Sequence, residues 1–113
     1  MHELALAREI VAIVERAAEG QSVHHIRIIR LELGAFGHVE VSALRFAFLA
    51  AAKDTIAEGA ELDITRSVGQ AWCLDCRITV TLESRLSPCP LCGGVKLDII
   101  GGAEFRVVEM EID

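Results

Sequence analysis

The sequence predicts an α+β fold: a small three-stranded sheet with two helices, interrupted by an inserted four-cysteine, zinc-ribbon-like module. Two segments carry apolar residues at helical spacing, and three short segments alternate between apolar and polar residues. All four cysteines fall between the second and third of these strands. With 113 residues, of which 52% are hydrophobic, the chain is long enough for one compact core and a small appendage.

The first predicted helix covers residues 4–18. Apolar residues recur there at intervals of three and four, charged residues fall mostly between them, and Gly20 ends the pattern. The first predicted strand covers residues 26–33, where the alternation changes phase between Ile28 and Ile29. Such a change predicts either a bulge or burial of both faces of the strand.

The second predicted helix follows a loop at residues 34–38. It runs from Val41 to Ala57, with Gly59 as its C-terminal cap. Phe46 and Leu49 lie opposite its main apolar face. These two side chains are either buried by a further layer of structure or present apolar surface to a partner protein.

Two further strands complete the predicted sheet. Residues 60–65 alternate strictly, and residues 104–112 alternate with a slip in phase between Val107 and Val108. The segment between these strands, residues 69–101, is bracketed by glycines, which are typical of linkers. We therefore expect two domains, one formed by residues 1–68 plus 102–113 and the other by residues 69–101.

The inserted segment contains two Cys-x-x-Cys knuckles, with twelve residues between Cys76 and Cys89. Two residues between paired cysteines let one tight turn aim both sulfurs at one point, and two facing turns make a tetrahedral thiolate cage of the kind that Zn²⁺ prefers. The expected zinc ligands are Cys73, Cys76, Cys89 and Cys92. A short hairpin within residues 78–88 is expected to close the cage, and Trp72 to shield the sulfurs.

Iron is the main competitor for this site, because the second knuckle resembles that of rubredoxin. The first knuckle has Arg77 where rubredoxin has a glycine, which favours zinc. A disulfide framework would require an export signal, and Glu3 and Arg8 interrupt any apolar start. At 33 residues the segment is shorter than the ~40 that usually fold without a staple. The zinc is therefore expected to be structural, with no open position for a substrate.

The charge of the chain argues against nucleic acid and membrane partners. Its formal net charge is −6, and four thiolates with one Zn²⁺ add −4 + 2 to give −8. Such a protein repels phosphate backbones and anionic lipids. No stretch approaches the ~18 uncharged apolar residues of a membrane span. Together with reduced cysteines, these features indicate a cytoplasmic protein.

The N-terminus, Met1-His2-Glu3, offers a second kind of metal site. A terminal amine, the next amide nitrogen and an imidazole can close two fused chelate rings around Ni²⁺ or Cu²⁺, which favour planar nitrogen ligands. The first amides of a helix have no intrahelical acceptor, so losing one amide proton there breaks no helical hydrogen bond. Glu3 either adds an oxygen ligand or interacts with the positive helix start.

Several stretches together resemble the HypA/HybF family of hydrogenase nickel-insertion accessory proteins. The resemblance lies in the opening Met1 to Ala7, in Leu33-Gly34-Ala35, in Val39 to Phe48, in the turn at residues 58–62 and in the two knuckles. The motifs cover essentially the whole chain in the same order. Some relatives carry histidines beside the zinc cysteines, and this chain has none there.

The resemblance implies a nickel metallochaperone rather than an enzyme. Such a protein delivers Ni²⁺ to the large subunit of [NiFe] hydrogenase together with a GTPase, and in some organisms also serves urease. The resemblance assigns nickel to His2 with the adjacent backbone, and structural zinc to the four cysteines. Two alternatives from other classes are a rubredoxin-like electron carrier and a zinc-ribbon adaptor for nucleic acid.

Overall fold

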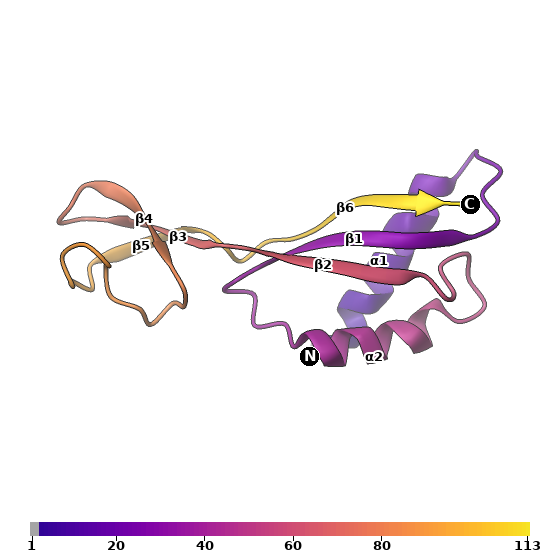
Figure 1. Cartoon of the computed structure of the whole chain (residues 1–113), viewed down its shortest axis with the longest axis horizontal. Helices are drawn as coiled ribbons and strands as arrows, with labels where there is room; N and C mark the ends of the chain where they lie inside the picture. The colour runs from indigo at the N-terminus through magenta and orange to yellow at the C-terminus, as the bar shows by residue number, and fades with distance from the viewer. Residues whose placement is uncertain (1–2) are drawn as a thin grey trace. The chain divides into compact units, whose positions relative to one another are not determined.

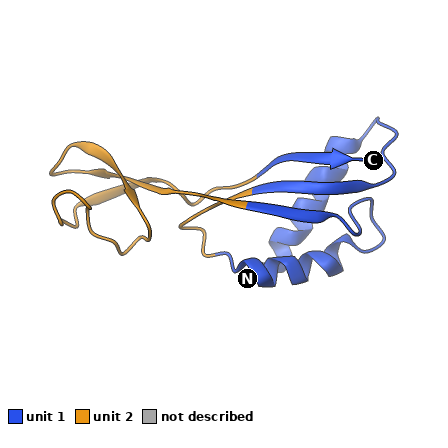
Figure 2. Cartoon of the chain, viewed as in Figure 1, with its two compact units in different colours: residues 1–31, 39–64, 107–113 blue, residues 32–38, 65–106 orange. Residues whose placement is uncertain are grey.

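The computed structural model describes residues 3–113 (Figure 1). The elements in chain order are α1 (Glu3–Ala18), β1 (Ile26–Gly34), α2 (Val41–Ala52), β2 (Glu61–Ser67), β3 (Gly69–Cys73), β4 (Ile78–Leu82), β5 (Leu97–Gly101) and β6 (Phe105–Ile112). Two helices with a sheet of β1, β2 and β6 confirm the predicted α+β class. The chain forms two compact units (Figure 2): unit 1 holds residues 1–31, 39–64 and 107–113, and unit 2 holds residues 32–38 and 65–106.

The first sheet has the strand order β2-β1-β6, with both helices on one of its faces (Figure 1). Strands β1 and β2 run in the same direction, and α2 makes the crossover between them, as parallel strands require. Strand β6 runs antiparallel to β1. The N–H of Gly34 donates to the carbonyl of Glu104 (2.7 Å) near one end of the pair, and the N–H of Asp113 donates to the carbonyl of His25 (3.3 Å) near the other.

The core of unit 1 is mainly aliphatic, with Phe48 as its aromatic member, and lies between the helices and the sheet. Its buried residues are Ala7, Ile10, Val11, Val14 and Ala18 of α1, Ile26, Ile29 and Leu31 of β1, Leu44, Phe48 and Ala52 of α2, and Ala57 and Leu62. Ile26 and Ile29 are both fully buried although they are three residues apart, which confirms the predicted change of phase.

The predicted end of α2 is wrong by five residues, because the helix stops at Ala52 rather than Ala57. Asp54 adopts a left-handed backbone (φ 64°), and the hydroxyl of Thr55 donates to the Ala52 carbonyl at 2.7 Å. Short polar side chains compete in this way with helical hydrogen bonds. Gly59 (φ 79°) belongs to the following turn and does not cap the helix.

Arg30 on the central strand ties together all three strands of this sheet. Its guanidinium lies 3.3 Å from the carboxylate of Asp63 on β2, and 3.5 Å and 2.6 Å from those of Glu109 and Glu111 on β6. Hydrogen bonds from Arg30, and then from Arg27, hold the pKa of Glu111 below its usual range. In turn, the pKa of Arg30 is raised, and its hydrogen bond with Glu111 is the first cause.

Unit 2 has its own three-stranded sheet, in the order β4-β3-β5, and both pairs are antiparallel. The prediction of a hairpin within residues 78–88 is wrong. Strand β4 pairs instead with the preceding β3, from Gly69 opposite Leu82 to Cys73 opposite Ile78, so that the first knuckle is the hairpin turn. Residues 83–88 form turns and contain no strand.

Phe36 lies in the predicted loop after β1, and it is also the aromatic core residue of unit 2. Its side chain is 2% exposed and packs with Ala71, Val80 and Leu82 and the buried cysteines. Two glycines make room for the ring: a Cβ added to Gly69 would overlap the ring itself, and one on Gly102 would meet it at 3.1 Å. Arg85 lies over the ring, 5.2 Å from its centroid.

Substituting Gly69 by alanine should destabilise unit 2 by about 1–3 kcal/mol, the usual cost of overpacking a core. The loss should be measured as a lower midpoint of chemical unfolding. Gly20→Ala is the matched control, because Gly20 has φ 78° and no atom within 4 Å of an added Cβ, so its cost is conformational only. A Gly69→Ala/Phe36→Leu double variant should recover part of the loss; strictly additive effects would contradict the proposed overlap.

No helix among residues 3–113 is long and apolar enough to cross a bilayer.

Candidate metal centre

The two knuckles adopt the same backbone turn. In the first, the N–H of Arg77 donates to the Cys73 carbonyl at 2.7 Å; in the second, the N–H of Gly93 donates to the Cys89 carbonyl at 2.8 Å. The donor residue is left-handed in both turns, with φ 58° at Arg77 and 72° at Gly93. A further bond from Leu74 N–H to the Lys96 carbonyl (3.0 Å) joins the first knuckle to the chain that follows the second.

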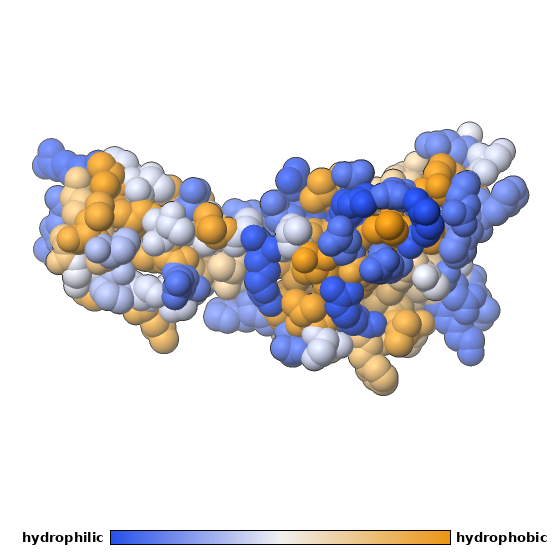
Figure 3. Space-filling view, viewed as in Figure 1, coloured by the Kyte–Doolittle hydropathy of each residue, from blue (hydrophilic) through white to orange (hydrophobic). Residues whose placement is uncertain are grey.

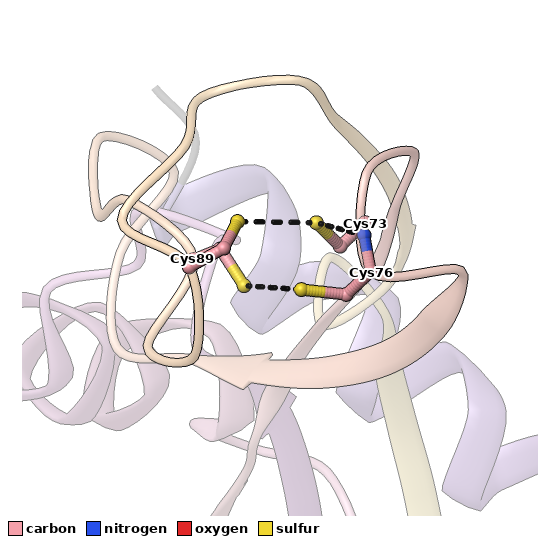
Figure 4. Close-up of side chains that lie close together, drawn as sticks. Cys73, Cys76 and Cys89 are labelled. Carbon is pink, nitrogen blue, oxygen red and sulfur yellow. Dashed lines mark hydrogen bonds between the residues drawn. The ribbon is translucent and has the colours of Figure 1, made fainter.

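These turns bring the four predicted ligands together. The Sγ atoms of Cys73, Cys76, Cys89 and Cys92 all lie within 4.8 Å of one another. The sulfurs of Cys73 and Cys92 are 3.8 Å apart, and those of Cys76 and Cys89 are 3.9 Å apart. Figure 4 draws the sulfurs of the labelled cysteines, with dashed lines between those that approach each other. A tetrahedron with metal–sulfur bonds of about 2.3 Å has sulfur–sulfur edges of about 3.8 Å. The spacing therefore fits one tetrahedral ion, and it is too long for disulfides.

Backbone amides stabilise negative charge on the sulfurs. The N–H of Cys76 donates to the Cys73 sulfur at 3.3 Å, and the Leu91 and Gly94 amides donate to the sulfurs of Cys89 and Cys92 at 3.4 Å each. Hydrogen bonds of this kind offset part of the charge of a four-thiolate site, which a divalent ion leaves at −2.

Interactions within the tetrad separate the pKa values of the thiols. The pKa of Cys76 is raised to about 12, first by its hydrogen bond with Cys92 and then by burial. The pKa of Cys89 is lowered to about 7, chiefly by the backbone N–H of Cys92. A metal ion must bind all four as thiolates, so its binding displaces protons and is favoured by rising pH.

The cage is part of the core of unit 2. Cys73 and Cys89 are 1% and 2% exposed and belong to the same cluster as Phe36, whereas Cys92 is exposed. The sulfurs therefore occupy positions where a larger domain would have aliphatic side chains. Within residues 3–113, these cysteines form the one group of three or more metal-ligating side chains.

Trp72 does not shield the sulfurs, contrary to the prediction. Successive residues of a strand face opposite sides of the sheet, and along β3 the buried residues are Ala71 and Cys73. Trp72 therefore points away from the cage, and 39% of it is exposed.

Arg77 also changes the interpretation of the first knuckle. The missing glycine was an argument against a rubredoxin-like turn, yet Arg77 takes the same left-handed conformation as Gly93. The backbone of the two knuckles is thus equivalent, and the residue type at position 77 does not separate zinc from iron.

Because an arginine pays a conformational cost at φ 58°, Arg77→Gly should stabilise the metal-loaded protein by about 0.5–1 kcal/mol. The mirror variant, Gly93→Ala, should destabilise it by about 1 kcal/mol, since an added Cβ there meets no atom within 4 Å and only the backbone conformation is affected. Both effects are measurable by thermal unfolding at fixed metal loading. Equal effects of the same sign would refute the equivalence of the two turns.

The predicted nickel ligands Met1 and His2 lie outside the described residues. Glu3 begins α1, and its carboxylate accepts a hydrogen bond from the Glu40 N–H at 3.3 Å. Glu40 is the N-cap of α2, because its own carboxylate accepts from the Ser42 N–H at 2.9 Å. The start of α1 therefore lies beside the start of α2. The carboxylate of Glu40 acts as a cap, and His38 lies in the preceding loop with φ 54°.

His25 makes contacts that the sequence does not predict. The imidazole of His25 lies 3.0 Å from the carboxylate of Asp113 and 3.1 Å from the carbonyl of Glu58. It joins the start of β1 to the end of the chain and to the turn before β2. Its partners are 88 and 33 residues away in the sequence, so no local sequence pattern predicts these contacts.

The fold and the site define a class: small α+β proteins in which a separate unit is organised around one four-thiolate metal site. The family profile described as "Hydrogenase/urease nickel incorporation, metallochaperone, hypA" matches residues 1–112. The chain is 48% identical over 113 residues to hydrogenase maturation factor HypA of Methylocella silvestris, and 47% identical to that of Rhodopseudomonas palustris strain TIE-1. Both alignments cover all of this chain and all of the relative.

The chain belongs to the HypA family, and it is therefore a maturation factor and metallochaperone rather than an enzyme. The solution structure of the Ni metallochaperone HypA from Helicobacter pylori superposes with a TM-score of 0.70 at 23% identity, covering 99% of this chain and 97% of that one. At this identity the likeness supports the fold alone. Family membership sets aside the electron-carrier and nucleic-acid-adaptor alternatives.

Proposed function

We propose that this chain binds one Ni²⁺ at its N-terminus and delivers it to the large subunit of [NiFe] hydrogenase during maturation. The proposed partners are that subunit, a maturation GTPase and, as a second route, urease accessory proteins. The proposal places the protein in the cytoplasm. The observation that carries it is the family match over residues 1–112, which includes Met1-His2-Glu3.

The proposed nickel ligands are the amine of Met1, a backbone amide nitrogen and the imidazole of His2, with the carboxylate of Glu3 as an oxygen donor. The beginning of α1 at Glu3 supports this assignment, because the first amides of a helix have no intrahelical acceptor to lose. A planar nitrogen set suits Ni²⁺.

The proposed role of the four cysteines is to hold Zn²⁺ permanently. The sulfur spacing fits a tetrahedral ion, and four thiolates leave no position for exchange with a substrate. The proposed functional division remains residues 1–68 plus 102–113 for nickel and residues 69–101 for zinc. Bound zinc would complete the small core of unit 2.

His2→Ala should abolish stoichiometric nickel binding, because it removes the imidazole and opens a chelate ring, while the fold is retained. Nickel titration of untagged protein, with circular dichroism as the fold check, measures both. His24→Ala is the matched control, since His24 is exposed and lies outside the proposed ligand set. An N-terminal extension should reproduce the His2→Ala result by blocking the amine. Unchanged one-to-one affinity in His2→Ala would reject the site.

Cys92→Ser should lose the zinc and unfold unit 2, while nickel binding at the N-terminus largely survives. The reason is that three thiolates no longer close the cage around which the core of unit 2 is built. Elemental analysis and the dispersion of amide NMR signals of unit 2 measure the effect. Asp75→Asn, a change inside a knuckle at a non-ligand position, should retain zinc. Iron rather than zinc in the wild-type protein would contradict the proposed metal.

A further inference from the structure

Helix α2 presents a continuous solvent-facing stripe. Its helical members repeat at helical spacing and are all exposed: Ser42, Arg45, Phe46, Leu49 and Ala50. The exposed C-cap residue, Lys53, lies directly after the end of the stripe and is counted with it. Phe46 is 77% exposed and Leu49 is 69% exposed, so burial by a further layer does not explain them. Figure 3 shows apolar surface over the α2 part of unit 1. Large side chains this exposed, next to each other on one helix, mark an interaction site.

A groove runs beside this stripe, between α2 and the start of β2. It has a volume of about 260 Å³ and is lined mainly by apolar side chains, including Phe46, Phe48 and Leu49 of α2 and Ala60 and Leu62. Glu61 is on the β2 wall. The groove therefore offers a place for an apolar side chain of a partner, adjacent to the two exposed apolar residues.

The stripe is basic in an acidic protein. Residues 41–53 contain Arg45 and Lys53 and no aspartate or glutamate, which gives +2 for this segment against −6 for the chain. Cations interspersed with apolar residues on one face complement a surface that carries carboxylates around an apolar centre.

The backbone beside the groove disfavours an added strand. Although β2 is an edge strand, the guanidinium of Arg45 donates to the Leu62 carbonyl at 2.6 Å. A strand that paired with β2 at the groove would have to displace this charged donor. Side chains in rows at spacings of three and four instead form ridges that interdigitate with those of another helix.

We propose that the α2 stripe binds an acidic amphipathic helix of a partner protein. One large apolar side chain of that helix enters the groove, and its carboxylates face Arg45 and Lys53. The start of α2 lies beside Glu3, through the Glu40 N–H, so a partner bound along α2 is held close to the beginning of α1. This inference rests on the proposed function, in which that end of the chain carries the nickel.

The test uses two purified probes: the precursor of the hydrogenase large subunit and the maturation GTPase. We expect at least one to bind the wild-type protein. Phe46→Glu and Leu49→Glu should each weaken binding about 30-fold, as expected for hot-spot residues. Lys53→Glu should weaken it about 3- to 10-fold, and added salt should abolish that difference. Leu86→Glu is the matched control, since Leu86 is 95% exposed in unit 2.

Hydrogen exchange on the bound probe should protect an acidic helical segment. Four outcomes overturn the inference: neither probe binds, the Phe46 and Leu49 variants bind like wild type, the protected segment is extended or basic, or Phe46→Glu only dissociates a dimer of this chain in sedimentation. Nickel titration of the same variants should still give a stoichiometry of one Ni²⁺ bound per chain. A wild-type protein that binds the probe through α2 but no nickel would refute the proposed function and leave the docking site standing.

Discussion

The convergence of four sulfurs is the constraint on which unit 2 depends. Cys73 and Cys89 fill core positions beside Phe36, and the two knuckles that hold them have the same hydrogen-bonded turn. These sulfurs lie at contact distance from those of Cys76 and Cys92, and the hydrogen bond with Cys92, followed by burial, raises the pKa of Cys76 to about 12. A divalent cation replaces the thiol protons and turns mutual repulsion into coordination. Under the proposed function, core packing and metal binding in this unit are one event.

Unit 1 is stabilised differently: it buries mainly aliphatic side chains, and ion pairs across the sheet add to this. Helix α1 contributes small and branched residues to the core, and Arg30 connects the central strand to carboxylates on both neighbours. The metal proposed for this unit is cargo, so its fold has to persist with and without nickel. A core closed by side chains alone meets that requirement, whereas a metal-closed core would not.

Local patterns were sufficient to predict α1, the strands β1 and β6, the change of phase in β1 and the cysteine cage, because each depends on residue spacing within one segment. Long-range contacts were not visible in such patterns. Phe36 does lie in the predicted loop, but its burial was not predicted, because its partners Gly69 and Gly102 lie more than thirty residues away. Trp72 was misassigned because its strand alternates, so that Cys73 and Trp72 face opposite sides. The end of α2 was missed because the polar Asp54 and Thr55 stop a helix whose apolar spacing continues to Ala57.

The close approach of Phe36 to two glycines also bears on how sequences of this family can diverge. The ring occupies the space that a side chain at position 69 would need. A side chain at position 102 would overlap the Cα of Gly69 and meet the ring at 3.1 Å, and Gly102 has φ 108°. None of the three residues can therefore be exchanged for a bulkier one in isolation. Substitutions at positions 36, 69 and 102 are therefore coupled, because the residue tolerated at any one of them depends on the other two.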